Sequence, residues 1–287
     1  MEAQTNRLYN DVKFLTDLRP YRNYLNLDSL TEVCLYIKEQ FTMAGLFIEE
    51  QKWIVDGREY TNVIATYNKD KVKRLIVGAH YDVCGNQPGA DDNASAVAGL
   101  LETARLIGSN KPNIDYRIDF VGYCLEEPPF FGTQEMGSYV HAKYLYENKI
   151  DVIGMICYEM IGFFSDQPNS QPFPDIEMAK IYPGTANFII VVGTIAHKEF
   201  NNKVHSLMTK KSKIDVQVIS FPNGDGLAGL SDQRNYWYFG YPALMINDTS
   251  FVRNPNYHLP SDTIETLDFE KITEVINSSY NAIIEII

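Results

Sequence analysis

Short, wholly apolar segments recur along the chain, and polar or acidic side chains follow each of them. Runs of this length match single strands that are buried on both faces, as in a parallel sheet covered by helices. The segments that share this pattern are 75–79, 118–124, 152–157, 188–192 and 243–246. The intervals between them suit helices, so the sequence predicts an α/β fold: a three-layer sandwich with a mostly parallel, mixed central sheet flanked by helices.

Further helix, hairpin and loop signals fall between these strands. Asn26 and Asp28 offer a helix N-cap, and the dipeptide Asp56-Gly57 separates two strand-like runs as a hairpin turn. The predicted elements are helices over 28–45 and 94–107, strands over 46–55 and 60–67, and loops over 165–184 and 221–229. The two loops either form the rim of a pocket or are variable surface connections. Because we find no repeat, linker or low-complexity tract, we expect a single domain over residues 1–287.

The charge of the chain excludes some partners. Acidic residues number 37 and basic residues 25, for a net charge of −12, which repels nucleic acid phosphates and anionic lipid. No segment approaches the roughly 18 apolar residues that a membrane span requires. We therefore expect no nucleic acid partner and no membrane insertion. The composition does not predict an oligomeric state.

The N-terminus and the cysteines bear on the cellular compartment. No basic start followed by an apolar stretch is present, so no signal peptide is visible and a cytoplasmic location is expected. A secreted or periplasmic location stays open for a chain whose leader has been removed. The four cysteines (Cys34, Cys84, Cys124 and Cys157) lack the close spacing of a zinc knuckle or redox pair, which predicts reduced core residues.

His80 and Asp82 follow the apolar run 75–79 and are the first candidate site residues. A period of two places both side chains on the same face. A carboxylate in that position can accept a hydrogen bond from the second ring N–H of a metal-bound imidazole. Taken alone, His80 also fits an ordinary buried histidine.

Two pairs of adjacent acidic residues are the next candidates. Asp91 and Asp92 lie in a tight turn before the helix 94–107, where helix capping is the simpler explanation. Two adjacent glutamates, Glu126 and Glu127, follow a strand and repel each other unless a cation or a shared proton lies between them. Pro128 disfavours helical geometry at Glu127, so the two carboxylates should point in different directions. A solvated surface pair is the alternative.

Two isolated residues complete the set. Glu159 follows the strand 152–157 in apolar company, where a carboxylate requires a cation or several hydrogen-bond donors. His258 lies in a loop before the last helix. In parallel sheets, ligands bind beyond the carboxyl ends of the strands. Two histidines and several carboxylates at that edge suit zinc, with cobalt or manganese as substitutes.

Taken together, the motifs resemble those of the co-catalytic zinc exopeptidase family that includes bacterial leucyl-type aminopeptidases, plasma glutamate carboxypeptidases and glutaminyl-peptide cyclases. The motifs His-x-Asp, Gly-Ala-Asp-Asp-Asn-Ala-Ser, Glu-Glu and the late Tyr-His occur in the family's order. The resemblance extends from about Asp11 to the C-terminus. It implies the zinc-exopeptidase fold, of the phosphorylase/hydrolase-like type, and a peptide substrate.

The resemblance also implies a role for each site residue. His80 and Glu159 would be ligands of one zinc ion, and Glu127 and His258 of the other. Asp92 would bridge both ions, in a turn where the family often has a cis peptide after this residue.

Two catalytic roles follow from the same resemblance. Glu126 would be the general base, and Asp82 would orient His80. The expected cofactor is Zn²⁺, two ions per chain or one in a cyclase, and the expected activity is that of a metallo-exopeptidase, with an aminopeptidase favoured.

The chain departs from the family pattern at three places. Glu159 stands where many members have aspartate, which lengthens the ligand arm by one methylene. Gln233 stands where a histidine is common, and the stretch 128–137 is longer than in compact members.

Two other functions remain as alternatives. A glutaminyl-peptide cyclase keeps nearly the same ligand set with a single zinc, although the tryptophan that cyclases commonly have before the last histidine is Tyr257 here. A non-catalytic binding protein on the same fold would usually lack ligands or the base. Whether the enzyme would remove N-terminal or C-terminal residues also stays open. Arg234 and Arg253 could bind the C-terminal carboxylate of a substrate, although solvated side chains are the simpler interpretation.

Overall fold

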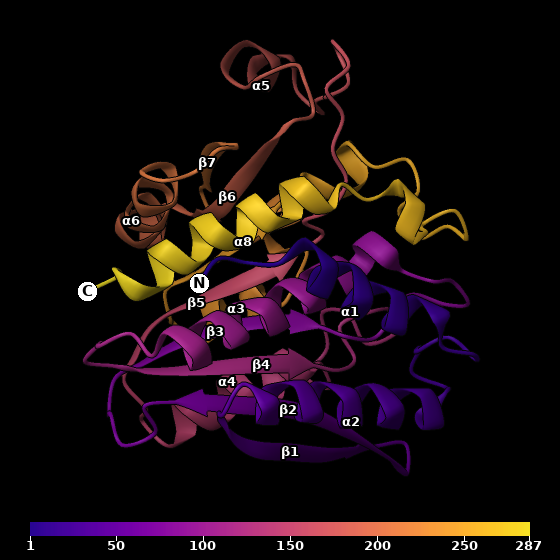
Figure 1. The fold of residues 1–287 in the computed structure, drawn as a ribbon, viewed down its shortest axis with the longest axis vertical. Helices are drawn as coiled ribbons and strands as arrows, with labels where there is room; N and C mark the ends of the chain where they lie inside the picture. Colours follow the sequence, from indigo (N-terminus) through magenta and orange to yellow (C-terminus); the bar gives the residue numbers. More distant parts are fainter.

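The computed structural model describes residues 1–287, and its strands form one eight-stranded sheet in the order β1-β2-β4-β3-β5-β8-β6-β7 (Figure 1). The strands are β1 (Phe47–Val55), β2 (Arg58–Tyr67), β3 (Arg74–His80), β4 (Arg117–Tyr123), β5 (Val152–Glu159), β6 (Phe188–Thr194), β7 (Asp215–Phe221) and β8 (Ala243–Asn247). The pairs β3/β4, β3/β5, β5/β8 and β6/β7 are parallel. The pairs β1/β2, β2/β4 and β6/β8 are antiparallel. This mixed sheet confirms the predicted α/β fold.

Helices cover both faces of the sheet and complete the three layers. The α-helices are α1 (Thr5–Asp17), α2 (Leu27–Met43), α3 (Ala96–Asn110), α4 (Gly137–Glu147), α5 (Ile176–Ile181), α6 (Lys198–Thr209), α7 (Gln233–Tyr238) and α8 (Phe269–Ile284). Helices α1, α2, α3, α6 and α8 contribute to the larger hydrophobic core. Helices α4 and α7 contribute to the smaller core on the opposite face.

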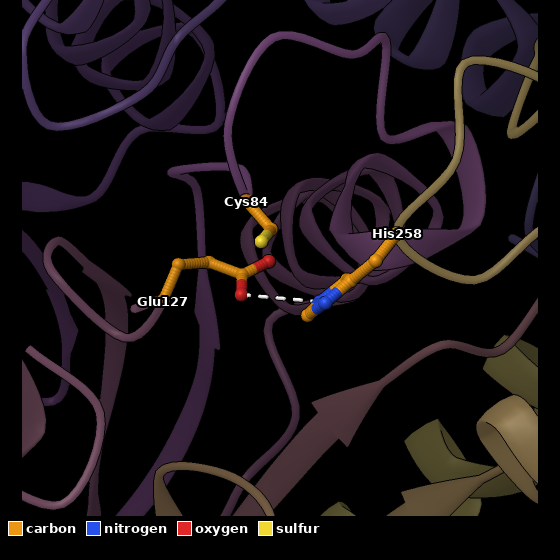
Figure 2. A group of neighbouring side chains, drawn as sticks. All are labelled: Cys84, Glu127 and His258. Carbon is orange, nitrogen blue, oxygen red and sulfur yellow. Dashed lines mark ion pairs between the residues drawn. The ribbon is translucent and has the colours of Figure 1, made fainter. Parts of the chain in front are cut away.

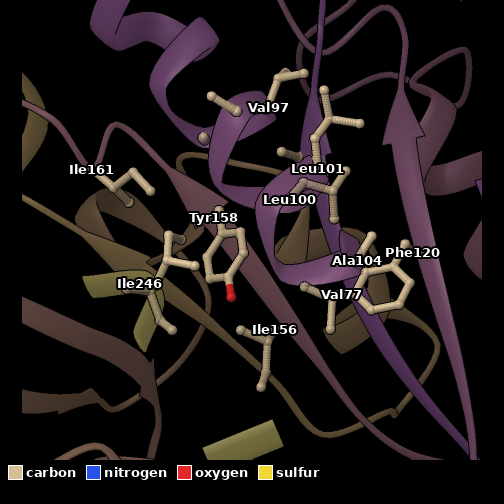
Figure 3. Packing of buried hydrophobic residues seen from close by; sticks show 14 of the residues in the cluster. Val77, Val97, Leu100, Leu101, Ala104, Phe120, Ile156, Tyr158, Ile161 and Ile246 are labelled. Carbon is tan, nitrogen blue, oxygen red and sulfur yellow. The ribbon is translucent and has the colours of Figure 1, made fainter. Parts of the chain in front are cut away.

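Alternation along the central strands divides the apolar side chains between the two cores. Leu75 and Val77 of β3 pack in the larger core, whereas Ile76 between them packs in the smaller one, as the period of two requires. In the larger core, Leu100 and Leu101 of α3 lie among strand residues such as Val77 and Phe120 (Figure 3). Both faces of these strands are therefore dry, which explains why their sequences are uninterrupted apolar runs.

The predicted strands and the two predicted helices all form, but several elements were missed. The Asp56-Gly57 turn has φ values of 49° and 75° and joins β1 to β2. Strand β7 and helices α1, α4, α6 and α7 were not predicted. The loop assigned to 165–184 is wrong over Ile176–Ile181, which forms α5, and 221–229 contains a short 3-10 turn at Gly226–Gly229.

None of the helices is both long enough and apolar enough to cross a membrane. All four cysteines are free thiols, and Cys34, Cys124 and Cys157 are buried as expected. The prediction of a core position is wrong for Cys84, which is only partly buried. It lies in the loop after β3, and burial together with the charges of Glu127 and Asp92 raises the pKa of its thiol to about 11.

Candidate active site

Four of the predicted site residues lie where central parallel strands end. His80 is the last residue of β3 and Glu159 the last of β5, while Glu126 and Glu127 follow β4. Because β3, β4 and β5 are parallel neighbours, these side chains meet at one edge of the sheet. Asp92 joins them from the turn Ala90–Ser95 before α3. The structure thus brings together residues that the sequence separates widely.

The Asp92 carboxylate faces both imidazoles. Its Oδ1 lies 3.4 Å from His80 Nε2, and its Oδ2 lies 3.0 Å from His258 Nε2. Each oxygen is therefore directed to a different histidine, which is the arrangement expected of a carboxylate that bridges two cations. His258 itself is held by Tyr257, whose ring stacks on the imidazole with centroids 3.7 Å apart.

Each imidazole has a second carboxylate beside it. Glu159 Oε2 is 3.3 Å from His80 Nε2, and Glu127 Oε2 is 3.2 Å from His258 Nε2 (Figure 2). Two donor sets result, one of His80 and Glu159 and one of His258 and Glu127, which share Asp92. The extra methylene of Glu159 does not keep its carboxylate from reaching His80.

Glu126 and Glu127 point in different directions, as the sequence predicts, although a Glu127 oxygen also lies within 4.8 Å of a His80 ring nitrogen. Glu126 Oε2 is 3.8 Å from His80 Nε2, whereas Glu127 is beside His258. The preceding residue, Leu125, has a φ of 62°, which turns the chain where β4 ends. Glu126 therefore faces the centre of the cluster but belongs to neither the His80–Glu159 set nor the His258–Glu127 set.

Asp82 has a wider role in the geometry than the sequence suggests. Its Oδ1 lies 3.6 Å from His80 Nδ1, while its backbone oxygen is closer, at 3.2 Å. The carboxylate accepts hydrogen bonds from the backbone N–H groups of Glu126 and Glu127, at 3.2 and 3.1 Å. Asp82 thus fixes the glutamate pair, and its backbone contributes to the orientation of His80.

The two neighbouring acids in the Asp91-Asp92 turn have different surroundings. Asp91 accepts hydrogen bonds from Asn254 Nδ2 at 2.7 Å and from the Gly162 N–H at 2.9 Å, so its carboxylate is used within the scaffold. The Asp262 carboxylate accepts from the N–H groups of Asp91 and Asp92. The peptide bond between Asp92 and Asn93 is cis, as the family resemblance implies.

A fully buried arginine, Arg22, supports the loops that carry the site, and the sequence reasoning missed it. Its guanidinium donates to the carbonyl oxygens of Tyr81, Pro88, Gly89 and Leu15. Burial lowers its pKa to about 10, an effect opposed by the surrounding acids. Arginine is usually exposed, and these partners are backbone atoms, so no sequence pattern marks this residue.

We expect Arg22→Ala to lower the stability of the metal-free protein strongly. The substitution leaves buried carbonyl oxygens without donors, and each such loss costs roughly 1–3 kcal/mol. Urea unfolding should show a lower midpoint than the wild-type protein. Arg19→Ala is the matched control, because Arg19 donates only to the nearby carbonyls of Thr16 and Leu18. Equal midpoints for the two variants would contradict the role of Arg22.

The segment Ser231–Gln233 supports the same side of the cluster. Ser231 Oγ donates to Glu159 Oε2 at 2.6 Å, and Gln233 Nε2 donates to the Ala228 carbonyl at 2.8 Å. Gln233 therefore has a local hydrogen bond and does not reach the histidines. Asp232 was also missed: its buried oxygens have no hydrogen-bond partner, and burial raises its pKa to about 7.

Burial and mutual repulsion shift the proton affinities of the cluster. Burial, followed by the charge of Asp92, raises the pKa of Glu127 to about 7, and burial also raises that of Glu126. Burial lowers the pKa of His258, but Asp92 and Glu127 outweigh it and raise the value to about 10. Perturbed titrating groups in one cluster are typical of a functional site.

The donor set fits divalent metal ions. Oε1 of Glu126 and Oε1 of Glu127 are buried without hydrogen-bond partners, and His258 Nε2 faces two carboxylate oxygens without hydrogen-bonding geometry. Buried polar atoms normally find partners, and a cation among them would satisfy these atoms together. Imidazole nitrogens and carboxylate oxygens are donors that zinc accepts.

An apolar pocket lies beside the Glu159 end of the cluster, because its lining residue Asn247 donates to the Glu159 backbone oxygen at 2.6 Å. It is lined by residues of β6, β7 and β8, including Ile190, Ile219 and Met245, and by Leu230, the neighbour of Ser231. Both loops 165–184 and 221–229 contribute lining residues, which confirms the interpretation of these segments as a pocket rim. The stretch 128–137 lines a separate, more polar pocket together with Arg234.

The two arginines considered for binding a substrate carboxylate have different surroundings. Arg253 is buried, and its guanidinium donates to Gln171 Oε1 and to the carbonyl oxygens of Phe163 and Phe188, so its interpretation as a solvated side chain is wrong. Arg234 lies over the Phe131 ring at 4.7 Å.

Comparison with known proteins places the chain in a family. Residues 62–282 match Peptidase family M28, and the chain belongs to this family. It is 38% identical over 283 residues to protein YfbL of Escherichia coli K12, covering 96% of this chain and 86% of that protein. It is also 25% identical to a probable leucine aminopeptidase of Trichophyton verrucosum, covering 93% of this chain and 69% of the relative.

Solved structures share the fold at low sequence identity. Legionella pneumophila LapA has a TM-score of 0.78 at 21% identity, covering 98% of this chain and 73% of that one. A glutaminyl cyclase of Bacteroides thetaiotaomicron has a TM-score of 0.75 at 18% identity, covering 99% of both chains. LapA is described as an aminopeptidase, so an aminopeptidase and a cyclase share this architecture, and fold similarity alone does not separate the two activities.

Proposed function

We propose that this protein is a zinc-dependent aminopeptidase that removes N-terminal residues from peptides with two metal ions. The observation that carries the proposal is Asp92, whose two carboxylate oxygens face different imidazoles, His80 and His258. Membership of Peptidase family M28 supports hydrolysis. The metal ligands we propose are His80, Asp92 and Glu159 at one position, and Asp92, Glu127 and His258 at the other.

The chemistry of the proposed reaction requires a base beside the metals. When bound, two zinc ions would lower the pKa of a shared water and polarise the scissile carbonyl. Glu126 is the base we propose, because its carboxylate faces the cluster and its Oε1 has no hydrogen-bond partner. It would take the proton of the attacking water and deliver it to the leaving amine. Asp82 would hold Glu126 in place through the backbone N–H.

The charge of the cluster supports the removal of N-terminal residues, and the apolar pocket supports a preference for apolar side chains. The cluster is rich in carboxylates, which favours a free ammonium group near the metals. Arg253, a candidate for binding a terminal carboxylate, uses its donors within the scaffold. The pocket lined by Ile190, Met245 and Leu230 would accept an apolar side chain. We therefore propose peptides with an apolar N-terminal residue as the substrates.

Glutaminyl-peptide cyclisation is the second candidate, because cyclases have the same architecture. Two observations favour the peptidase. Each carboxylate oxygen of Asp92 faces a different histidine, which suits two metal ions. Tyr257, rather than a tryptophan, stacks on His258. Release of ammonia from a glutaminyl peptide without cleavage of a peptide bond would favour the cyclase over the peptidase.

A panel of short peptides tests the proposal. We expect release of the N-terminal residue from a leucyl peptide amide, which has no C-terminal carboxylate, and no release from the N-acetylated peptide. Addition of a zinc chelator should abolish the activity, and added zinc should restore it. Mass spectrometry of the products identifies cleavage or cyclisation directly. Equal cleavage of the acetylated and free peptides would contradict an aminopeptidase.

A further inference from the structure

Cys84 lies against one of the two donor sets, and neither the motifs nor the roles described above use it. The thiol points from the loop after β3 toward Glu127 and His258 (Figure 2). The Cys84 Sγ, a Glu127 carboxylate oxygen and a His258 ring nitrogen all lie within 4.8 Å of one another. Three potential ligand atoms from three separate loops therefore converge on one point.

The other two members of this group have atoms that lack partners. The Glu127 side chain is only 4% exposed, and its Oε1 makes no hydrogen bond. His258 Nε2 also makes none, although it faces carboxylate oxygens of Asp92 and Glu127. Unpartnered buried donor atoms directed to one point indicate a ligand there, and the thiol is beside that point.

We propose that Cys84 Sγ is a ligand of the metal position formed by Asp92, Glu127 and His258. The proposal rests on the two-metal function proposed above. As the bond between sulfur and the cation forms, the thiol proton leaves to solvent, since a coordinating thiol is deprotonated. Zinc binds sulfur at about 2.3 Å and nitrogen or oxygen at about 2.0–2.2 Å, and the three ligand atoms already lie within 4.8 Å of one another.

This ligand makes the two metal positions unequal. The Cys84 position would have four protein donors besides the shared water, one more than the three of a usual catalytic zinc site. The His80 position has three, namely His80, Asp92 and Glu159, and keeps an open coordination position as catalytic zinc sites do. We infer that the Cys84 position anchors its ion more firmly, and that chelators empty the His80 position first.

Cobalt substitution tests this ligand without any activity measurement. We expect the metal-free protein, titrated with Co²⁺ under reducing conditions, to develop a near-ultraviolet thiolate-to-cobalt charge-transfer band. Cys84→Ser should lose this band but still show the visible absorption of bound cobalt. Cys34→Ser is the matched control and should keep the band, because the buried Cys34 thiol contacts the Tyr81 hydroxyl and no proposed ligand. Chelator competition should show roughly 10-fold or more weaker binding of one zinc ion by Cys84→Ser.

The possible results separate this proposal from the proposed function. Cobalt bound by the wild-type protein without the charge-transfer band overturns the Cys84 ligand and leaves the metal centre intact. A band that persists in Cys84→Ser also overturns it. Failure of the wild-type protein to bind cobalt at all overturns the two-metal function itself. Should Cys84→Ser fail to fold, Cys84→Ala removes the sulfur without adding a hydroxyl group.

Discussion

Glu126→Gln is expected to reduce the rate of peptide hydrolysis by roughly 100- to 10,000-fold, the usual contribution of general acid–base catalysis. The amide has nearly the shape of the carboxylate but cannot accept the proton of water. Because Glu126 faces His80 from 3.8 Å and belongs to neither proposed set of ligands, the variant should keep its metal. Steady-state kinetics on a leucyl peptide amide, with elemental analysis of the same sample, measure both effects.

Glu147→Gln is the control for this variant, because Glu147 lies exposed at the end of α4 and should leave the rate unchanged. The expected loss is in kcat, since the proton transfer occurs after the substrate has bound. Full peptidase activity in Glu126→Gln would refute the assignment of the base. Loss of bound metal in this variant would instead make Glu126 a ligand.

Asp92→Asn is expected to lose bound metal before any other property changes. One carboxylate oxygen becomes an amide nitrogen, which is not a donor to zinc, so the side chain can no longer serve both positions. Asp92 is the acid shared by the two histidines, 3.4 and 3.0 Å away. Metal content measured by elemental analysis should fall from two ions per chain to one or none, and peptidase activity should be abolished.

Asp56→Asn is the control for this variant, because it makes the same chemical change in the exposed turn between β1 and β2. It should retain the wild-type metal content. Circular dichroism of Asp92→Asn would show whether the fold persists, since Asp262 still binds the backbone of this turn. Two ions retained in a folded Asp92→Asn protein would contradict the bridging role.

The central strands could be predicted from the sequence because burial on both faces leaves an unbroken apolar run. Strand β3 is the clearest case, because its polar residues, Arg74 and His80, stand only at its two ends. Strand β7 was missed because it is an edge strand with a partly exposed face, and its residues alternate between apolar and polar. Helix α1 carries its buried residues Leu8, Val12 and Leu15 at helical spacing, a signal that was present but not used.

The candidate site was predicted only in part, for physical reasons. His80, Glu126 and Glu159 could be found because each follows a recognisable strand. Asp92 and His258 were named through the family resemblance, and the contact between them depends on how the loops pack. Arg22 could not be found, because hydrogen bonds to carbonyl oxygens leave no local pattern in the sequence. Cys84 stands two residues after Asp82, but its place beside His258 depends on how distant loops pack.

The separation of the site residues along the chain has a consequence for biosynthesis. His80, Glu127 and Glu159 leave the ribosome well before His258, and domains form from the N-terminal part as synthesis proceeds. The position that requires His258 cannot be complete until the residues up to the start of α8 have emerged and β8 has joined the sheet beside β5. The second metal of the proposed centre would therefore bind to an essentially finished polypeptide, and a nascent chain stalled before this point would have an incomplete site.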